Sequence, residues 1–155
     1  MVPLSSQVCS PVLVIRRSSC ADVQYMIPLM RQLRYPTTVN VLKERLAMLE
    51  NHEQMSCLVA ELDGKVVGTV FLKQHQTHDM SKPVTLITAL IVDDEHRGQG
   101  IGRRLLDEAE RWGAVRRSSQ LHVSVARESS FSSKPFYERC GFVSAGYHLS
   151  KRVQG

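Results

Sequence analysis

Alternating glycines between Gly98 and Gly102 are the residues whose types and spacing point most directly to chemistry. An apolar run at residues 90–92 precedes them and an amphipathic run from residue 101 follows, which predicts a strand, a tight turn and a helix. Glycine lacks a Cβ, so a bulky anion can approach the N–H groups of such a turn. The first N–H groups of the helix have no intrahelical partner and lie at the positive end of its dipole. The pattern therefore predicts a phosphate-binding site, to which three side chains add charge: Arg97, Arg103 and Arg104.

The glycine spacing excludes two common nucleotide-binding motifs. A dinucleotide fingerprint needs G-x-G-x-x-G, but here the third glycine comes one residue early and Arg103 stands in its place. The next predicted strand, at residues 121–125, also lacks the carboxylate that would bind a ribose. A P-loop needs Gly-Lys-Ser/Thr, and Gly102 is followed by two arginines. The phosphate therefore belongs to another kind of ligand.

A second motif occupies residues 134–142. Pro135 suits the first turn of a helix and Gly141 suits the position that ends one, which predicts a helix of about two turns. Tyr137 lies in this helix, and a phenol with an ordinary pKa of about 10 can act as a proton donor. The alternative is that Tyr137 is an amphipathic packing residue between helix and sheet.

Together these motifs resemble those of the GNAT superfamily of N-acetyltransferases, in its small bacterial form. Residues 97–102 fit its pattern Arg/Gln-x-x-Gly-x-Gly/Ala, and residues 136–142 fit its run Phe-Tyr-Glu-x-x-Gly-Phe. The resemblance implies that the turn holds the pyrophosphate of acetyl-CoA, that the preceding strand contacts the pantetheine arm, and that Tyr137 is the general acid. The implied cofactor-binding residues are Leu90, Ile91, Val92, Arg97, Gly98, Gln99, Gly100, Ile101, Gly102, Arg103 and Ser130.

The chain departs from the family pattern at Ser130. Seven residues before the tyrosine, relatives commonly carry an asparagine that contacts the pantetheine arm, and here a serine stands at that position. Its hydroxyl can still form a hydrogen bond, with fewer donors and acceptors than an amide. The departure affects the detail of the pantetheine contact.

The predicted elements follow the family order over residues 12–152. Asp63-Gly64 is a strong hairpin signal between two strands. The strands are expected at residues 12–16, 56–62, 66–72, 85–92 and 121–125, with closing strands within 142–152. The resemblance implies an α/β (α+β) fold with a mixed, mostly antiparallel sheet of about seven strands and about four helices, splayed between strands four and five. We expect residues 1–11 to be a flexible N-terminal segment and residues 12–155 to form one N-acetyltransferase domain.

Two helices are expected between the first two strands. Ser18 or Ser19 can cap the first, and Pro28 should bend or interrupt it. A second helix starts near residues 36–38. Between them, Tyr35 is either a wall of the acceptor pocket or a plain junction residue. The apolar stripe of the first helix is Val23, Met26, Ile27, Met30 and Leu33.

Composition restricts the partners and the compartment. The chain has 155 residues, 43% of them hydrophobic, and no apolar run approaches the ~20 residues of a membrane span. Its start lacks the pattern of a signal peptide, so a cytoplasmic location is expected. A net charge of +5 suits an anionic cofactor, but the basic pairs are scattered, which disfavours nucleic acid. The four cysteines show no metal-ligand spacing, and His75, His78 and Asp79 are interpreted as solvated loop residues, so no metal is expected.

The expected reaction is direct transfer of an acetyl group from acetyl-CoA to a primary amine, on a small molecule or a peptide. A non-catalytic acyl-CoA sensor and a transferase that uses a longer acyl-CoA are the alternatives, and a homodimer is left open. No carboxylate lies within residues 85–92, where many relatives carry a glutamate. Glu61 and His122 are therefore both open as the general base.

Overall fold

The computed structural model describes residues 12–33, 37–125, 133–146 and 149–154. The chain divides into two compact units, residues 1–124 and residues 125–155. Among the described residues, the first unit contains a β-sheet with three α-helices, and the second contains one short α-helix. The segment expected to be flexible, residues 1–11, lies outside the described residues.

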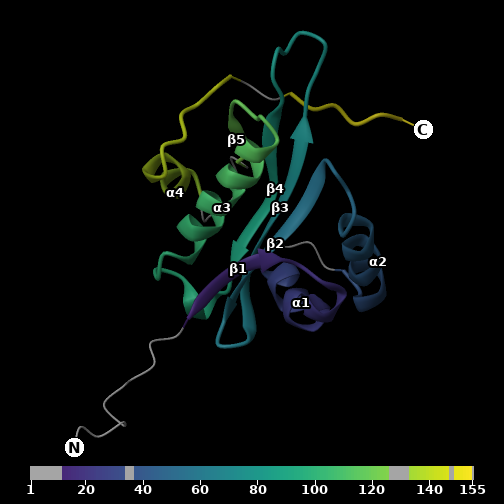
Figure 1. The fold of residues 1–155 in the computed structure, drawn as a ribbon, viewed down its shortest axis with the longest axis vertical. Helices are drawn as coiled ribbons and strands as arrows, with labels where there is room; N and C mark the ends of the chain where they lie inside the picture. The colour runs from purple at the N-terminus through teal and green to yellow at the C-terminus, as the bar shows by residue number, and fades with distance from the viewer. Residues whose placement is uncertain (1–11, 34–36, 126–132, 147–148, 155) are drawn as a thin grey trace, which may run out of the picture. The chain divides into compact units, whose positions relative to one another are not determined.

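A mixed sheet of five strands organises the first unit, and its order follows the sequence, β1-β2-β3-β4-β5 (Figure 1). The first four strands are antiparallel neighbours, and β5 runs parallel to β4. The turn Asp63-Gly64 joins β2 to β3 with positive φ at both residues, as the hairpin signal predicted. The strands are β1 (Leu13–Arg17), β2 (Met55–Leu62), β3 (Lys65–His75), β4 (Val84–Val92) and β5 (Leu121–Val123).

The sheet is smaller than the sequence predicted. Among the described residues of 142–152, no strand forms, so the expectation of about seven strands is wrong. Val143 is 84% exposed and Leu149 is 90% exposed, so the segment has no buried apolar alternation that would hold it to a sheet. Gly146, at a φ of +111°, also departs from extended backbone.

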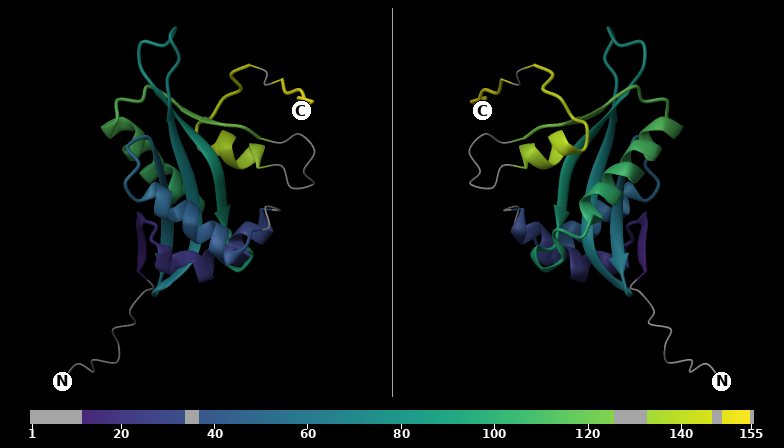
Figure 2. Two further views of the ribbon diagram at one scale, coloured as in Figure 1. Left: turned by 90° about the vertical axis from the view of Figure 1, so that its right-hand side faces the viewer. Right: turned by 90° about the vertical axis from the view of Figure 1, so that its left-hand side faces the viewer.

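Helices cover both faces of the sheet. Helices α1 (Val23–Gln32) and α2 (Val39–Leu49) lie on one face, and α3 (Ile101–Val115) lies on the other (Figure 1). The left view of Figure 2 looks onto the side of the sheet covered by α2, and the right view looks onto the side covered by α3. The second unit contributes α4 (Lys134–Arg139). The described residues thus form four α-helices, the number expected from the sequence.

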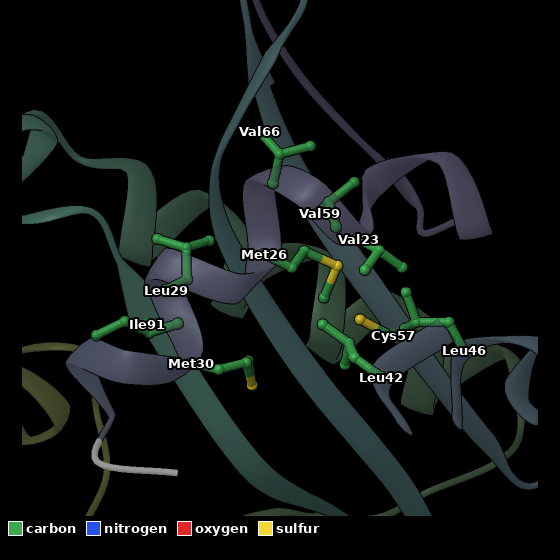
Figure 3. Close-up of a cluster of buried hydrophobic side chains, with 10 residues drawn as sticks. All are labelled: Val23, Met26, Leu29, Met30, Leu42, Leu46, Cys57, Val59, Val66 and Ile91. Carbon is green, nitrogen blue, oxygen red and sulfur yellow. The ribbon is translucent and has the colours of Figure 1, made fainter. Parts of the chain in front are cut away.

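A hydrophobic core fills the space between α1, α2 and the sheet (Figure 3). The predicted stripe on α1 is confirmed, because Val23, Met26 and Met30 are buried, while Ile27 and Leu33 pack at its margin. Pro28 does not interrupt the helix, which continues to Gln32. Burial of the residues on either side of the proline holds the helix together there. The core cluster is Val23, Met26, Leu29, Met30, Leu42, Leu46, Cys57, Val59, Val66 and Ile91.

Candidate functional site

One edge of β4 is open over half of its length. β3 pairs with β4 from residue 84 to residue 92, whereas β5 pairs only with residues 85–87. Thr88 is an extra residue in the ladder, because Leu72 pairs with Ile87 and Phe71 pairs with Ala89. Such a bulge bends a strand and increases its local twist. Pairing between the two strands therefore stops at the bulge, and no described residue pairs with residues 88–92 on the β5 side.

The open edge offers backbone hydrogen bonds to a ligand. Asp93 donates its N–H to the Val67 carbonyl over 2.8 Å, so the backbone of Asp93 is directed toward β3. Backbone direction alternates along a strand, so Leu90 and Val92 direct their N–H and C=O groups toward the open edge, where the Val92 carbonyl also accepts from Arg97 Nε. The Ile91 side chain is buried in the core. An extended ligand could therefore bind this edge as an added strand does.

After β4, a short 3-10 helix, η3 (Asp94–His96), leads into the glycine turn. Gly98 and Gly100 both have a positive φ, +77° and +80°, which residues with a Cβ rarely adopt. Gly100 is the N-cap of α3 and has no side chain to accept a hydrogen bond from the first turn. Arg104 is the first residue whose N–H bonds back into the turn, to the Gly100 carbonyl at 3.1 Å. The earlier N–H groups of α3 are available to an anion.

The three arginines of the turn differ in their partners. Arg97 forms an ion pair with Asp94 at 2.8 Å, and its Nε donates to the Val92 carbonyl at 3.2 Å. Arg97 therefore supports the turn and shares its charge with a carboxylate. Arg103 and Arg104 are exposed, and their side chains form no hydrogen bond or ion pair within the described part of the chain. Both line a cavity of about 460 Å³ between the turn and the β1–β2 end of the sheet. Its other lining residues are Leu13, Leu62, Gln99, Gly100, Ile101 and Asp107.

A clamp from α1 holds the connection between β4 and α3. The side chain of Gln32 donates to Asp93 Oδ1 at 3.3 Å and accepts from the Asp94 N–H at 3.2 Å. Burial would raise the pKa of Asp93, but hydrogen bonds from Gln32 and from the Glu95 N–H hold that pKa below its usual value. His96 Nδ1 lies 3.5 Å from the same carboxylate. Sequence patterns did not indicate this clamp, because a glutamine at a helix end carries no recognisable signal.

Tyr137 lies in α4 of the second unit and is only 7% exposed. Its ring makes edge-to-face contacts with Phe136 and Phe142, with centroids 5.2 Å and 5.3 Å apart. Burial, with a smaller contribution from Cys140, raises the pKa of Tyr137 to about 12. The phenol therefore keeps its proton over the whole physiological range. Both functions considered for Tyr137, proton donor and packing residue, are compatible with this environment.

No metal centre or membrane span is found in the parts of the chain that the structure covers. No three metal-ligating side chains gather there, and the loop with His75, His78 and Asp79 forms no such group. Within the described ranges, no helix is both long enough and apolar enough to cross a membrane. Ser130 and Tyr35 lie outside the described residues, so their predicted contacts stay predictions.

Comparison with known proteins identifies the family. The model of the acetyltransferase (GNAT) family matches residues 26–142, which include the open edge, the glycine turn and α4. The chain belongs to the GNAT acetyltransferase family. The resemblance inferred from the two motifs is thus confirmed.

Solved structures of GNAT acetyltransferases share the fold at low sequence identity. An aminoglycoside N-acetyltransferase AAC(6')-Iy, in complex with CoA, has a TM-score of 0.84 at 16% identity, covering 96% of this chain and 99% of that one. Glucosamine-6-phosphate N-acetyltransferase from Arabidopsis thaliana has a TM-score of 0.78 at 19% identity, with 92% and 99% covered. A GNAT family acetyltransferase from Staphylococcus aureus has a TM-score of 0.76 at 22% identity, with 91% and 98% covered.

Proposed function

We propose that this GNAT protein is an N-acetyltransferase that moves the acetyl group of acetyl-CoA to a primary amine by direct attack. The observation that carries the proposal is the continuity of the open edge of β4 with the uncapped start of α3. A ligand that combines an extended arm with a pyrophosphate fits both parts. Residues 88–92 would bind the arm through the backbone, and the turn from Gly98 would hold the phosphates, with Arg103 adding positive charge.

The chemistry needs one new bond and two proton transfers. The amine nitrogen attacks the thioester carbonyl carbon, the C–S bond breaks, and the sulfur leaves as a thiolate. The amine loses a proton to a base, and the thiolate takes a proton from Tyr137 in our proposal. We also propose that residues 12–155 act as one N-acetyltransferase domain.

Of the two candidate bases, His122 is favoured over Glu61. Glu61 lies on β2, where Arg16 Nε is 3.4 Å from its carboxylate. His122 Nε2 likewise lies 2.7 Å from Gln120 Oε1, so the position in the sheet distinguishes the two candidates. His122 is the register partner of Leu86 on β4 and lies next to the point where the strands part. Leu86 in turn pairs with Lys73 of β3, and Lys73 lies two residues after Phe71, so it points to the same face of the sheet. Register partners share a face, so the His122 side chain lies on the face that carries Phe71 and is covered by α1 and α2.

Thermal unfolding with and without acetyl-CoA tests the proposal. At about 100 times its dissociation constant, a ligand that binds only the folded state stabilises it by about 2.7 kcal/mol. For a domain of this size, that corresponds to a rise in Tm of roughly 5–10 °C. The variant Gly100→Asp should abolish the rise, because it places bulk and negative charge where phosphate would bind.

Gly64→Asp is the matched control, because Gly64 has a similar φ of +79° but lies in the β2–β3 hairpin. It should lower the Tm without acetyl-CoA yet keep the rise on binding. A wild-type Tm that is the same with acetyl-CoA, with CoA and without ligand would overturn the proposal. Release of free thiol across an amine panel then separates an enzyme from a sensor that only binds.

A further inference from the structure

A second cavity lies on the face of the sheet opposite α3, among α1, α2, β3 and β4. It has a volume of about 230 Å³ and meets β4 at Thr88 and Ala89. These two residues are the bulge and its neighbour, so the cavity touches β4 where the open edge begins. A group seated in this cavity would lie beside the part of β4 that we assign to the acyl-CoA arm. The remaining lining residues are Met30, Leu33, Thr37, Leu42, Arg45 and Phe71.

The walls of the cavity are mostly apolar and contain no carboxylate among the described residues. Met30, Leu42 and Phe71 belong to or border the hydrophobic core, of which Figure 3 shows Met30 and Leu42. Thr37 and Thr88 supply hydroxyl groups, which can accept hydrogen bonds from an amine. The volume is below the ~300–1,000 Å³ typical of sites for drug-sized ligands, so a short apolar group fits and a large ring system does not.

Arg45 is the charged residue of the described lining. It lies on α2, three positions after Leu42, and its side chain is exposed. Within the described part of the chain it forms no hydrogen bond or ion pair, in contrast with Arg16 and Arg97, which both pair with carboxylates. A guanidinium beside an apolar cavity is suited to bidentate binding of a carboxylate.

We propose that this cavity selects the acceptor, and that the acceptor is a primary amine carrying a short apolar group and a single carboxylate. The inference rests on the proposed acetyltransferase function and adds the class of substrate. The apolar group enters the cavity, Arg45 binds the carboxylate, and the amine lies near Thr88. One arginine balances one negative charge, which favours a carboxylate over a phosphate dianion. A polycationic amine would place like charge beside Arg45 and find no carboxylate in the described lining.

Matched pairs of amines test the class of acceptor. Each amino acid with a short apolar side chain, such as leucine or methionine, is compared with its carboxamide, which has the same shape and lacks the negative charge. Free thiol release gives kcat and KM for each compound, with spermidine as a polycationic comparison. We expect the carboxylates to have a kcat/KM roughly tenfold above their amides, from the loss of a charge-assisted hydrogen bond.

Variants of Arg45 assign that preference to the cavity. Arg45→Gln should raise the KM for the carboxylates roughly tenfold and leave both the amides and the KM for acetyl-CoA unchanged. Lys43→Gln is the matched control, because Lys43 is exposed on the same helix and does not line the cavity. Equal kcat/KM for acids and amides, or an acid preference that persists in Arg45→Gln, would overturn the inference while leaving the transferase intact.

A binding measurement separates failure of the inference from failure of the proposed function. Calorimetric titration of leucine and leucinamide into the CoA-saturated protein does not depend on turnover. Binding of leucine that is weakened in Arg45→Gln, without turnover of any amine, supports the cavity assignment and refutes the transferase. Absence of binding by either compound, or equal binding of both, refutes the cavity assignment.

Discussion

At the scale of single residues, Tyr137 and Gly100 carry most of the proposed function. Gly100 adopts a backbone conformation that leaves the N–H groups of α3 accessible, and its role is purely geometric. Tyr137 keeps its proton because burial raises its pKa to about 12. For transfer of that proton to be favourable, the leaving thiolate must be poorly solvated too, since burial raises the pKa of a thiol in the same way.

Replacement of Tyr137 by phenylalanine keeps the ring and its contacts with Phe136 and Phe142. We expect kcat to fall by ~10²–10⁴-fold, the range typical of general acid catalysis, with little change in the affinity for acetyl-CoA. Because the pKa is raised, the acid form persists to high pH, and wild-type kcat should show no alkaline loss from this group below about pH 11. Full turnover of Tyr137→Phe, under conditions where chemistry limits the rate, would make Tyr137 a packing residue.

At the scale of elements, α3 packs closely against the sheet at two glycines, one on β3 and one on α3 itself. A Cβ at Gly68 would lie 3.2 Å from the Leu105 side chain, and a Cβ at Gly113 would lie 2.5 Å from Thr85 Oγ1. Gly113 does not end α3, because the helix continues to Val115. Gly113 is instead a position where α3 lies close to Thr85 of β4, the strand that carries the open edge.

Gly113→Ala should destabilise the fold although alanine is the better helix former. The gain in helix propensity is about 1 kcal/mol, whereas overpacking a filled contact costs about 1–3 kcal/mol, so a net loss of about 1 kcal/mol is expected. Urea unfolding measures the change. In a Thr85→Ala background the overlap is relieved, and the same substitution should become neutral or stabilising. An equal loss in both backgrounds would show that the contact with Thr85 is not the cause.

At the scale of the whole molecule, an ion pair joins β1 to the start of the helical layer. Arg16 bonds to Asp22 at 2.7 Å and 2.9 Å, and Asp22 also accepts the Ser19 N–H in a capping box. Burial would raise the pKa of Asp22, but the hydrogen bond from Arg16, then that of the Ser19 N–H, lowers it. The carboxylate is only 6% exposed, so its charge depends on Arg16.

Arg16→Met should cost about 2 kcal/mol of unfolding free energy. This lies between the ~0–1 kcal/mol of an exposed pair and the ~3–5 kcal/mol of a buried one, because Arg16 itself is 34% exposed. The pKa of Asp22 is lower in the folded state, so this stability is present above the unfolded pKa of about 4 and lost as pH falls through the folded pKa. The difference between wild type and Arg16→Met should therefore shrink between pH 5 and pH 3. Arg17→Met, at the neighbouring position, should show no such pH dependence.

Local sequence patterns were sufficient to predict those features of this protein that depend on residues close together in the chain. Each of these features is formed by residues near one another in the sequence. They are the glycine turn, the Asp63-Gly64 hairpin, the stripe of α1 and the two family motifs. The count of strands was overestimated because strand formation depends on a distant partner and on buried alternation, which Val143 and Leu149 lack.

Tertiary structure alone decided which residues far apart in the chain meet. Gln32 lies 61 positions before Asp93, yet it clamps the turn that begins the proposed phosphate site. The bulge at Thr88 and the early end of β5 create the open edge, and both depend on pairing between strands. Arg45 reaches the cavity beside β4 only because α2 folds back over the sheet. Motifs therefore predicted the family and its chemistry, whereas packing between distant segments determined the clamp, the open edge and the cavity that we assign to the acceptor.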